Sequence, residues 1–202
     1  MNLHRPGSIP KRIMERAEAL PEATPICANA LLDLGNRAAV DQALSRLVRG
    51  KKLLRVCPGV HMLPEPSPYG PLPPDLGPSL RALAGLWGET IVVNGGAAAN
   101  VLGLITQNMI VPTFLTSGPN RRLDIGGTVR LFHAPRWQLL LPDRLSGTVI
   151  RALSFLGKEA VHESLEELRP RLSPEDRTEL LAARPSLPTW MAEAATRHLA
   201  HA

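Results

Sequence analysis

The residues of this chain best suited to chemistry lie between positions 36 and 55, and the chemistry they suit is recognition of double-stranded DNA. Asparagine, arginine, glutamine and serine side chains hydrogen-bond to base edges, whereas arginine and lysine pair with phosphates. We expect base contacts from Asn36, Arg37, Ala38, Gln42 and Ser45. We expect phosphate contacts from Arg46, Arg49, Lys51, Lys52 and Arg55. Asp41 lies one helical turn beyond Arg37 and is expected to orient that arginine rather than to touch DNA.

A helix followed by a β-hairpin must position these side chains. Apolar residues recur at helical spacing and predict one buried stripe, formed by Val40, Ala43, Leu44, Leu47 and Val48. Asn36 is suited to cap the start of this helix, and Gly50 is suited to end it. Residues 51–56 then predict a basic strand, residues 57–59 a turn, and residues 60–63 the returning strand.

Two earlier helices are expected to complete the motif. The first runs from Ser8 to Pro21, with Ile9, Ile13, Ala17 and Leu20 on its inner face, and the second covers residues 28–34. Three helices followed by a hairpin are typical of a winged helix-turn-helix, which lays one helix in the major groove of DNA.

The positive charge of the chain is concentrated in this part. Up to Leu63 there are 10 Lys or Arg against 5 Asp or Glu, which gives +5, and +5 is also the net charge of the whole chain. Such a concentration is expected where phosphates are contacted. Seven prolines between residues 64 and 78 then predict an extended linker. We therefore predict a winged-helix domain over residues 1–63, a proline-rich linker over 64–78 and a second domain over 79–202.

The second domain alternates between helical and extended patterns. The sequence predicts strands at 90–93 and 111–116, a hairpin of 123–125 with 128–133, and helices at 79–87, 97–102, 144–156, 161–168, 174–183 and 189–199. The expected fold class is α+β, with an N-terminal winged helix-turn-helix and a C-terminal α/β domain that ends in a helical tail.

The sequence contains no motif typical of an enzyme, a metal site or a cofactor site. Cys27 and Cys57 have no metal-type spacing, and His133 and His162 stand alone, so all four are expected to be structural. The Asn94-Gly95-Gly96 turn lacks the lysine of a phosphate-binding loop, and close packing of a small-residue helix on a strand explains it better. We expect no enzyme, no catalytic residue, no metal and no cofactor.

A polar loop in the second domain leaves two readings open. Arg121, Arg122 and Asp124 could form a site for a partner, or they could be a hairpin connection with a local ion pair. The chain has no apolar run of membrane-spanning length and no signal-peptide core at its start, so we expect a cytoplasmic protein without a membrane partner.

Three segments of the chain resemble the AbiEi-type antitoxins of bacterial toxin–antitoxin systems, in their short form. They are ALSRLVRGKKLLRVCPGVHML, GGAAANVLGLITQ and FLTSGPNRRLDIGGTVRLFHA. The resemblance implies a repressor that binds an inverted-repeat operator in its own promoter, as a homodimer on DNA, and an antitoxin that opposes a cognate nucleotidyltransferase-like toxin. His61 is a departure, because the family usually has tyrosine at this end of the wing.

A protein-interaction module remains the alternative from a different class. In that reading the basic domain binds RNA or a partner protein directly, and a sequence-specific, salt-dependent shift of a promoter fragment would be absent.

Overall fold

The computed structural model describes residues 7–107 and 110–200 and has a mixed α+β fold with a helical tail. The chain forms two compact units, the first made of Met1–Gly88 with Arg122–Val129 and the second of Glu89–Arg121 with Arg130–Ala202. This division differs from the predicted one, which placed the boundary in the proline-rich segment 64–78. Each unit is described by itself below.

The first unit begins with two short helical segments. Helix α1 spans Ile9–Glu18, follows Ser8, and has a proline in its first turn, where no backbone donor is lost. Ile13 and Ala17 are buried as predicted, but Leu20 lies beyond the helix and is 42% exposed, so its predicted place on the inner face is wrong. The helix predicted at 28–34 is only a 3₁₀ turn, η1, over Ala28–Leu31.

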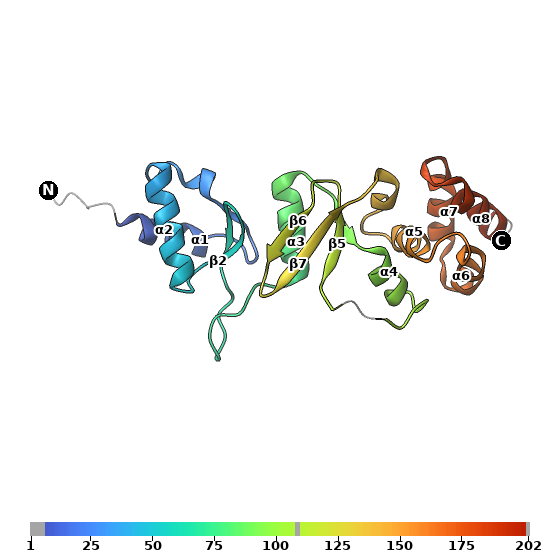
Figure 1. The fold of residues 1–202 in the computed structure, drawn as a ribbon, viewed down its shortest axis with the longest axis horizontal. Helices are drawn as coiled ribbons and strands as arrows, with labels where there is room; N and C mark the ends of the chain where they lie inside the picture. The colour runs from blue at the N-terminus through green and yellow to red at the C-terminus, as the bar shows by residue number, and fades with distance from the viewer. Residues whose placement is uncertain (1–6, 108–109, 201–202) are drawn as a thin grey trace. The chain divides into compact units, whose positions relative to one another are not determined.

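Helix α2 spans Arg37–Arg49 and has the predicted caps and the predicted stripe, of which Val48 is only half-buried. Its start is fixed by the Asn36 side chain, whose Oδ1 accepts a hydrogen bond from the Ala39 amide at 2.9 Å. Val40, Ala43, Leu44 and Leu47 are buried, and they pack against α1 and η1 in one apolar core. Figure 1 shows α1 and α2 lying beside one another next to the strands that follow.

The strands form a small antiparallel sheet of order β1-β3-β2. Their bounds are Ile26–Cys27 for β1, Leu54–Cys57 for β2 and Val60–Met62 for β3. The predicted hairpin is present, but its first strand starts at Leu54 rather than at residue 51, so the strand prediction for 51–53 is wrong. The reason is local: Lys51 has φ +54°, a left-handed conformation that reverses the chain after the helix.

The proline-rich segment is a hairpin-like arm rather than a fully extended linker. The amide of Glu65 donates to the Leu72 carbonyl at 2.8 Å, and the Leu72 amide donates back at 2.9 Å. At the tip, the Ser67 hydroxyl donates to the Gly70 carbonyl at 2.5 Å. The arm leads into helix α3, Leu76–Trp87, which begins three residues before the predicted start at Ser79.

A four-stranded sheet of order β4-β5-β7-β6 follows. Its strands are Ile91–Val93, Thr113–Thr116, Arg121–Asp124 and Thr128–His133 for β4 to β7. Strand β5 pairs antiparallel with β4 and parallel with β7, with Thr116 opposite His133. The predicted hairpin between β6 and β7 is confirmed, and Gly126 supplies its turn with φ +69°.

Helix α4, Gly95–Val101, packs closely on helix α5, Leu145–Leu156. A methyl group on Gly95 would lie 2.6 Å from the Arg151 carbonyl oxygen, so only glycine allows this approach. The predicted reason for the glycines, close packing, is right, but the partner is a helix and the predicted strand is wrong. The 3₁₀ turn η2, Arg136–Leu139, precedes α5.

The helical tail has the predicted bounds. Helices α6, α7 and α8 span Val161–Leu168, Pro174–Ala183 and Thr189–Leu199, with 3₁₀ turns η3 at Arg169–Arg171 and η4 at Arg184–Ser186. They gather at the C-terminal end of the chain (Figure 1), where α8 contacts both α6 and α7. Ser173 and Asp176 form a reciprocal capping box at the start of α7.

Candidate nucleic-acid interface

The side chains predicted to contact DNA lie on the exposed face of α2 and its N-cap, on the turn after the helix, and, for Arg55, on strand β2. All ten are exposed: Asn36, Arg37, Ala38, Gln42, Ser45, Arg46, Arg49, Lys51, Lys52 and Arg55. They belong to the first unit, and for the six that lie on α2 the exposure follows from the helical period, because the buried stripe occupies the opposite side.

A shallow groove between α2 and the β2–β3 turn brings only some of them together. Its polar lining comes from Arg37, Asp41, Ser45, Arg49, Arg55 and His61. Three arginines against one aspartate make this groove cationic. Ala38, Gln42 and Arg46 do not line it, and Lys51 and Lys52 lie beyond the end of the helix.

Arg37 is held in place by two neighbours. Its Nε donates to Asp41 Oδ2 at 2.8 Å, and its Nη1 donates to Asn29 Oδ1 at 2.6 Å. The predicted orientation of Arg37 by Asp41 is confirmed. Asn29 was not predicted, because it lies eight residues earlier in η1 and no local spacing links it to the helix. These bonds restrict the rotamers of Arg37 before any ligand arrives.

The Asn36 side chain caps α2, so part of its hydrogen-bonding capacity is already used before a base could bind. Its side-chain oxygen uses one of its two lone pairs for the cap of α2, which leaves the second lone pair and the amide NH₂ group for a ligand. The base contact of Asn36 stays a prediction.

His61 is buried at the centre of the small sheet, opposite Ile26 on one side and Arg55 on the other. Burial lowers its pKa from 6.5, and the nearby positive charge of Arg55 lowers it further. The imidazole is therefore neutral at pH 7. Its Nδ1 is buried without a hydrogen-bond partner within the described residues. The wing accommodates histidine here as a neutral core residue.

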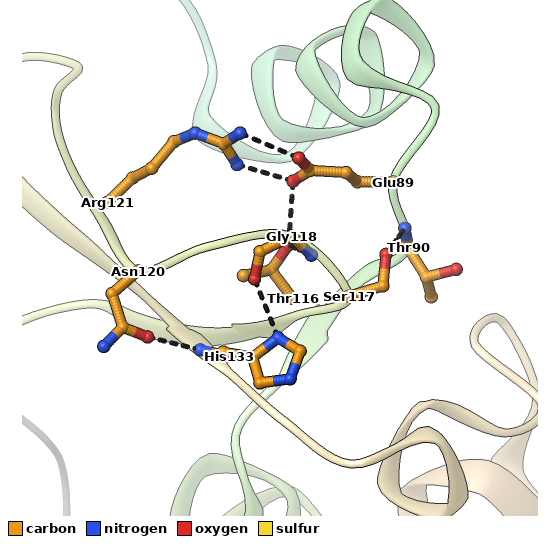
Figure 2. Close-up of polar contacts among 8 residues, drawn as sticks. All are labelled: Glu89, Thr90, Thr116, Ser117, Gly118, Asn120, Arg121 and His133. Carbon is orange, nitrogen blue, oxygen red and sulfur yellow. Dashed lines mark hydrogen bonds and ion pairs between the residues drawn. The ribbon is translucent and has the colours of Figure 1, made fainter.

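The polar loop predicted as a partner site contains a structural ion pair, shown in Figure 2. Arg121 donates to both carboxylate oxygens of Glu89, at 2.6 and 2.8 Å, and Thr116 donates to the same carboxylate at 3.0 Å. The predicted alternative of a local ion pair is wrong for Arg121, since its partner lies 32 residues earlier in the chain. The hydrogen bonds from Arg121, with a smaller contribution from Thr116, lower the pKa of Glu89.

The same cluster extends to the end of β7. The Gly118 amide donates to the Thr116 hydroxyl at 3.0 Å, and His133 Nδ1 lies 2.9 Å from the Gly118 carbonyl oxygen (Figure 2). Asn120 Oδ1 accepts from the His133 amide at 2.6 Å. These contacts fix the β5–β6 loop to the end of the sheet.

Arg122 and Asp124, the other two residues of the predicted partner site, are not part of this hydrogen-bonded cluster. Arg122 donates across the hairpin to the Thr128 hydroxyl at 2.9 Å, and Asp124 is exposed at the end of β6. Their role as a partner site stays a prediction.

The described ranges, 7–107 and 110–200, contain neither a metal-type cluster nor a membrane-spanning helix. No cluster of three or more His, Cys, Asp or Glu side chains there has an arrangement suited to a metal ion. His162 and His198 form a pair, with Nδ1 and Nε2 2.9 Å apart. No helix in those ranges combines the length and apolar character needed to cross a bilayer.

Comparison with known proteins gives a family and one fold relative. The model of DUF6088, a family of unknown function, matches residues 12–179. The crystal structure of the RV2827C protein from Mycobacterium tuberculosis is similar in fold, with a TM-score of 0.51 and 16% sequence identity. The alignment covers 97% of this chain and 78% of that one. No curated protein matches the chain.

Proposed function

This chain belongs to the DUF6088 family, and we propose that its first unit is a winged helix-turn-helix that binds double-stranded DNA sequence-specifically. The observation that carries the proposal is the exposed face of α2, which combines base-reading and cationic side chains beside a cationic groove. The element order α1-β1-η1-α2-β2-β3 and the strand order β1-β3-β2 support it, because a recognition helix followed by a hairpin is the winged-helix arrangement.

In this proposal the two ends of α2 have different tasks. Arg37, Ala38 and Gln42 read base edges, because the N-terminal half of a recognition helix enters the major groove, and Ser45 follows Gln42 by one turn on the same face. Arg37 is pre-oriented by Asp41 and Asn29 and retains Nη2 and the second N–H of Nη1 for guanine.

Phosphates are bound around that reading face. Arg46, Arg49, Lys51, Lys52 and Arg55 are all exposed and supply this contact. Each neutralised phosphate releases counterions, so the affinity should fall steeply with salt.

The biological role that we propose is autoregulation of a toxin–antitoxin operon in the cytoplasm. It rests on the resemblance to AbiEi-type antitoxins: a homodimer would repress through an inverted repeat, and the rest of the chain would oppose a nucleotidyltransferase-like toxin. Arg122 and Asp124 are the exposed part of the predicted partner site. Co-expression with the toxin encoded by the neighbouring gene tests this role, and growth arrest that persists in the presence of the antitoxin would refute it.

The DNA proposal is tested by anisotropy titrations of the full chain with its own promoter fragment and with a random duplex, over a range of salt concentrations. The double variant Arg37→Ala, Gln42→Ala should lose about 1–3 kcal/mol of discrimination per contact and retain general DNA binding. The matched control is Arg81→Ala, which removes an exposed arginine from α3 in the same unit.

Two results would contradict the proposal. If the double variant discriminates like the wild type, α2 is not the reading helix. If the wild type prefers RNA, or shifts no promoter fragment at low salt, the protein-interaction alternative is favoured.

A further inference from the structure

The second unit contains a small open cavity that DNA binding does not explain. Its volume is about 430 Å³, within the range of pockets that hold small molecules. Its lining combines two aromatic rings with polar groups, namely Phe132, Phe155, Gln138, Asn94, Ser154 and Arg151. Ser154 and Phe155 follow Arg151 by three and four residues on α5, so all three occupy one face of that helix.

Arg151 is a buried cation that donates hydrogen bonds to two neutral groups. Its side chain is among the largest that are fully buried, with 1% exposure. Nη1 donates to the Leu140 carbonyl at 3.2 Å and Nη2 to the Thr148 hydroxyl at 3.3 Å, both neutral acceptors. Within the described residues its Nε is buried without a hydrogen-bond partner.

The charge on Arg151 nevertheless persists at neutral pH. Burial lowers its pKa to about 10, and the negative charge of Asp143 opposes that change. Buried charges are normally paired, because an unpaired one costs several kcal/mol of desolvation. An arginine that remains charged and lines an open cavity is therefore poised for an anion from outside the chain.

The aromatic walls of the cavity are unusually exposed. Phe132 is 44% exposed and Phe155 57% exposed, and together they are two of the three phenylalanines in the chain. Gln138 Nε2 donates to Ser154 Oγ at 2.7 Å. Because that oxygen already accepts a bond, its hydroxyl hydrogen remains available to donate into the cavity. The lining thus offers ring faces beside cationic and hydroxyl donors.

We propose that this cavity binds a small molecule in which an anionic group is attached to a planar aromatic or heteroaromatic ring. The anion meets Arg151 and the Ser154 hydroxyl, and the ring lies against Phe132 and Phe155. This ligand supplies a counter-charge and covers the exposed rings at the same time. The site is independent of the DNA-binding proposal, because every residue that forms it belongs to the second unit.

Isothermal titration of the full chain tests the proposal with matched probes. Benzoate and adenosine 5′-monophosphate represent the ring-bearing anions, benzamide and adenosine are their neutral counterparts, and acetate and inorganic phosphate lack the ring. We expect at least one ring-bearing anion to bind, and its neutral counterpart and its ringless counterpart to bind about tenfold more weakly or worse. The choice between benzoate and the nucleotide identifies the ligand class. If neither binds, or if the neutral probe binds equally well, the proposal is wrong.

Two variants locate the site. Arg151→Met preserves volume and should remove the preference for the anion, whereas Arg197→Met, which removes an exposed arginine of α8, should have no effect. The double variant Phe132→Ala, Phe155→Ala changes exposed rings and serves as the second test if Arg151→Met does not fold. Binding unchanged in the phenylalanine variant, or an unchanged anion preference in folded Arg151→Met, would overturn the assignment.

Discussion

Replacing Lys51 by glycine should stabilise the protein while weakening its binding to DNA. Lys51 follows the cap of α2 with φ +54°, a conformation that costs an L-residue about 1–2 kcal/mol. Glycine avoids this cost but loses about 0.5–1 kcal/mol through the greater freedom of the unfolded chain. The midpoints of these ranges give a net gain in unfolding free energy of about 0.75 kcal/mol, which for a chain of this size raises Tm by about 1.5–3 °C.

The matched control is Lys52→Gly. Lys52 is the next residue and is equally exposed, but it is not among the described residues with positive φ, so glycine there brings only the entropic loss. Lys52→Gly should therefore lower Tm, while both variants should reduce the slope of log affinity against log salt by about 0.9.

Thermal unfolding and salt-dependent anisotropy measured on the same preparations give both quantities. Equal destabilisation by the two variants would refute the conformational reasoning. An unchanged salt slope in both variants would show that Lys51 and Lys52 do not contact DNA phosphates.

Three further predictions concern the second unit and α3. Gly118→Ala should destabilise the fold by about 2–4 kcal/mol, because the added methyl would lie 2.0 Å from the carboxyl carbon of Glu89 and displace the pair with Arg121; chemical denaturation measures this loss. The lowered pKa of Glu89 means that its stabilising contribution is present above its unfolded value of about 4.5 and is lost as pH falls through the lower folded value. Stability curves below pH 5 should therefore be flatter for Glu89→Gln, and identical curves would contradict the prediction. Gly95→Ala should destabilise by about 1–3 kcal/mol through its clash with α5, whereas Gly85→Ala, inside α3 with open space around it, should stabilise by about 0.5–1 kcal/mol.

Local signals in the sequence were sufficient for most helices. The caps at Asn36 and Ser173 and the prolines between the tail helices act within a few residues, so they identify helix ends without knowledge of the fold. Strand β1 was missed as a strand because Ile26 and Cys27 gain their partners only from β3, more than thirty residues later. Lys51 was assigned to a strand because composition does not reveal a positive φ at a lysine.

The candidate sites also contain one part that local sequence patterns predict and another that depends on the tertiary fold. The exposed face of α2 follows from the 3.6-residue period, so the six predicted DNA-contact residues on that helix are all accessible. Three other features depend on contacts between separate elements, and no spacing in the sequence predicts them. They are the Asn29–Arg37 bond, the Glu89–Arg121 pair and the cavity around Arg151. The sequence also shows that Arg151 belongs to a helix, but not that its charge is buried.

The first unit is discontinuous in sequence, since it joins the chain up to Gly88 with Arg122–Val129. A ribosome must therefore synthesise residues 89–121, the first segment of the next unit, before the last piece of the first one emerges. At roughly 5–20 residues per second, synthesis of residues 89–129 takes about 2–8 s, during which the nascent first unit lacks the hairpin tip that lies against Pro73. The first unit therefore cannot be completed before synthesis of the next one has begun, so it should acquire protease resistance only after residue 129 has emerged, and still before the second unit, most of which is synthesised later.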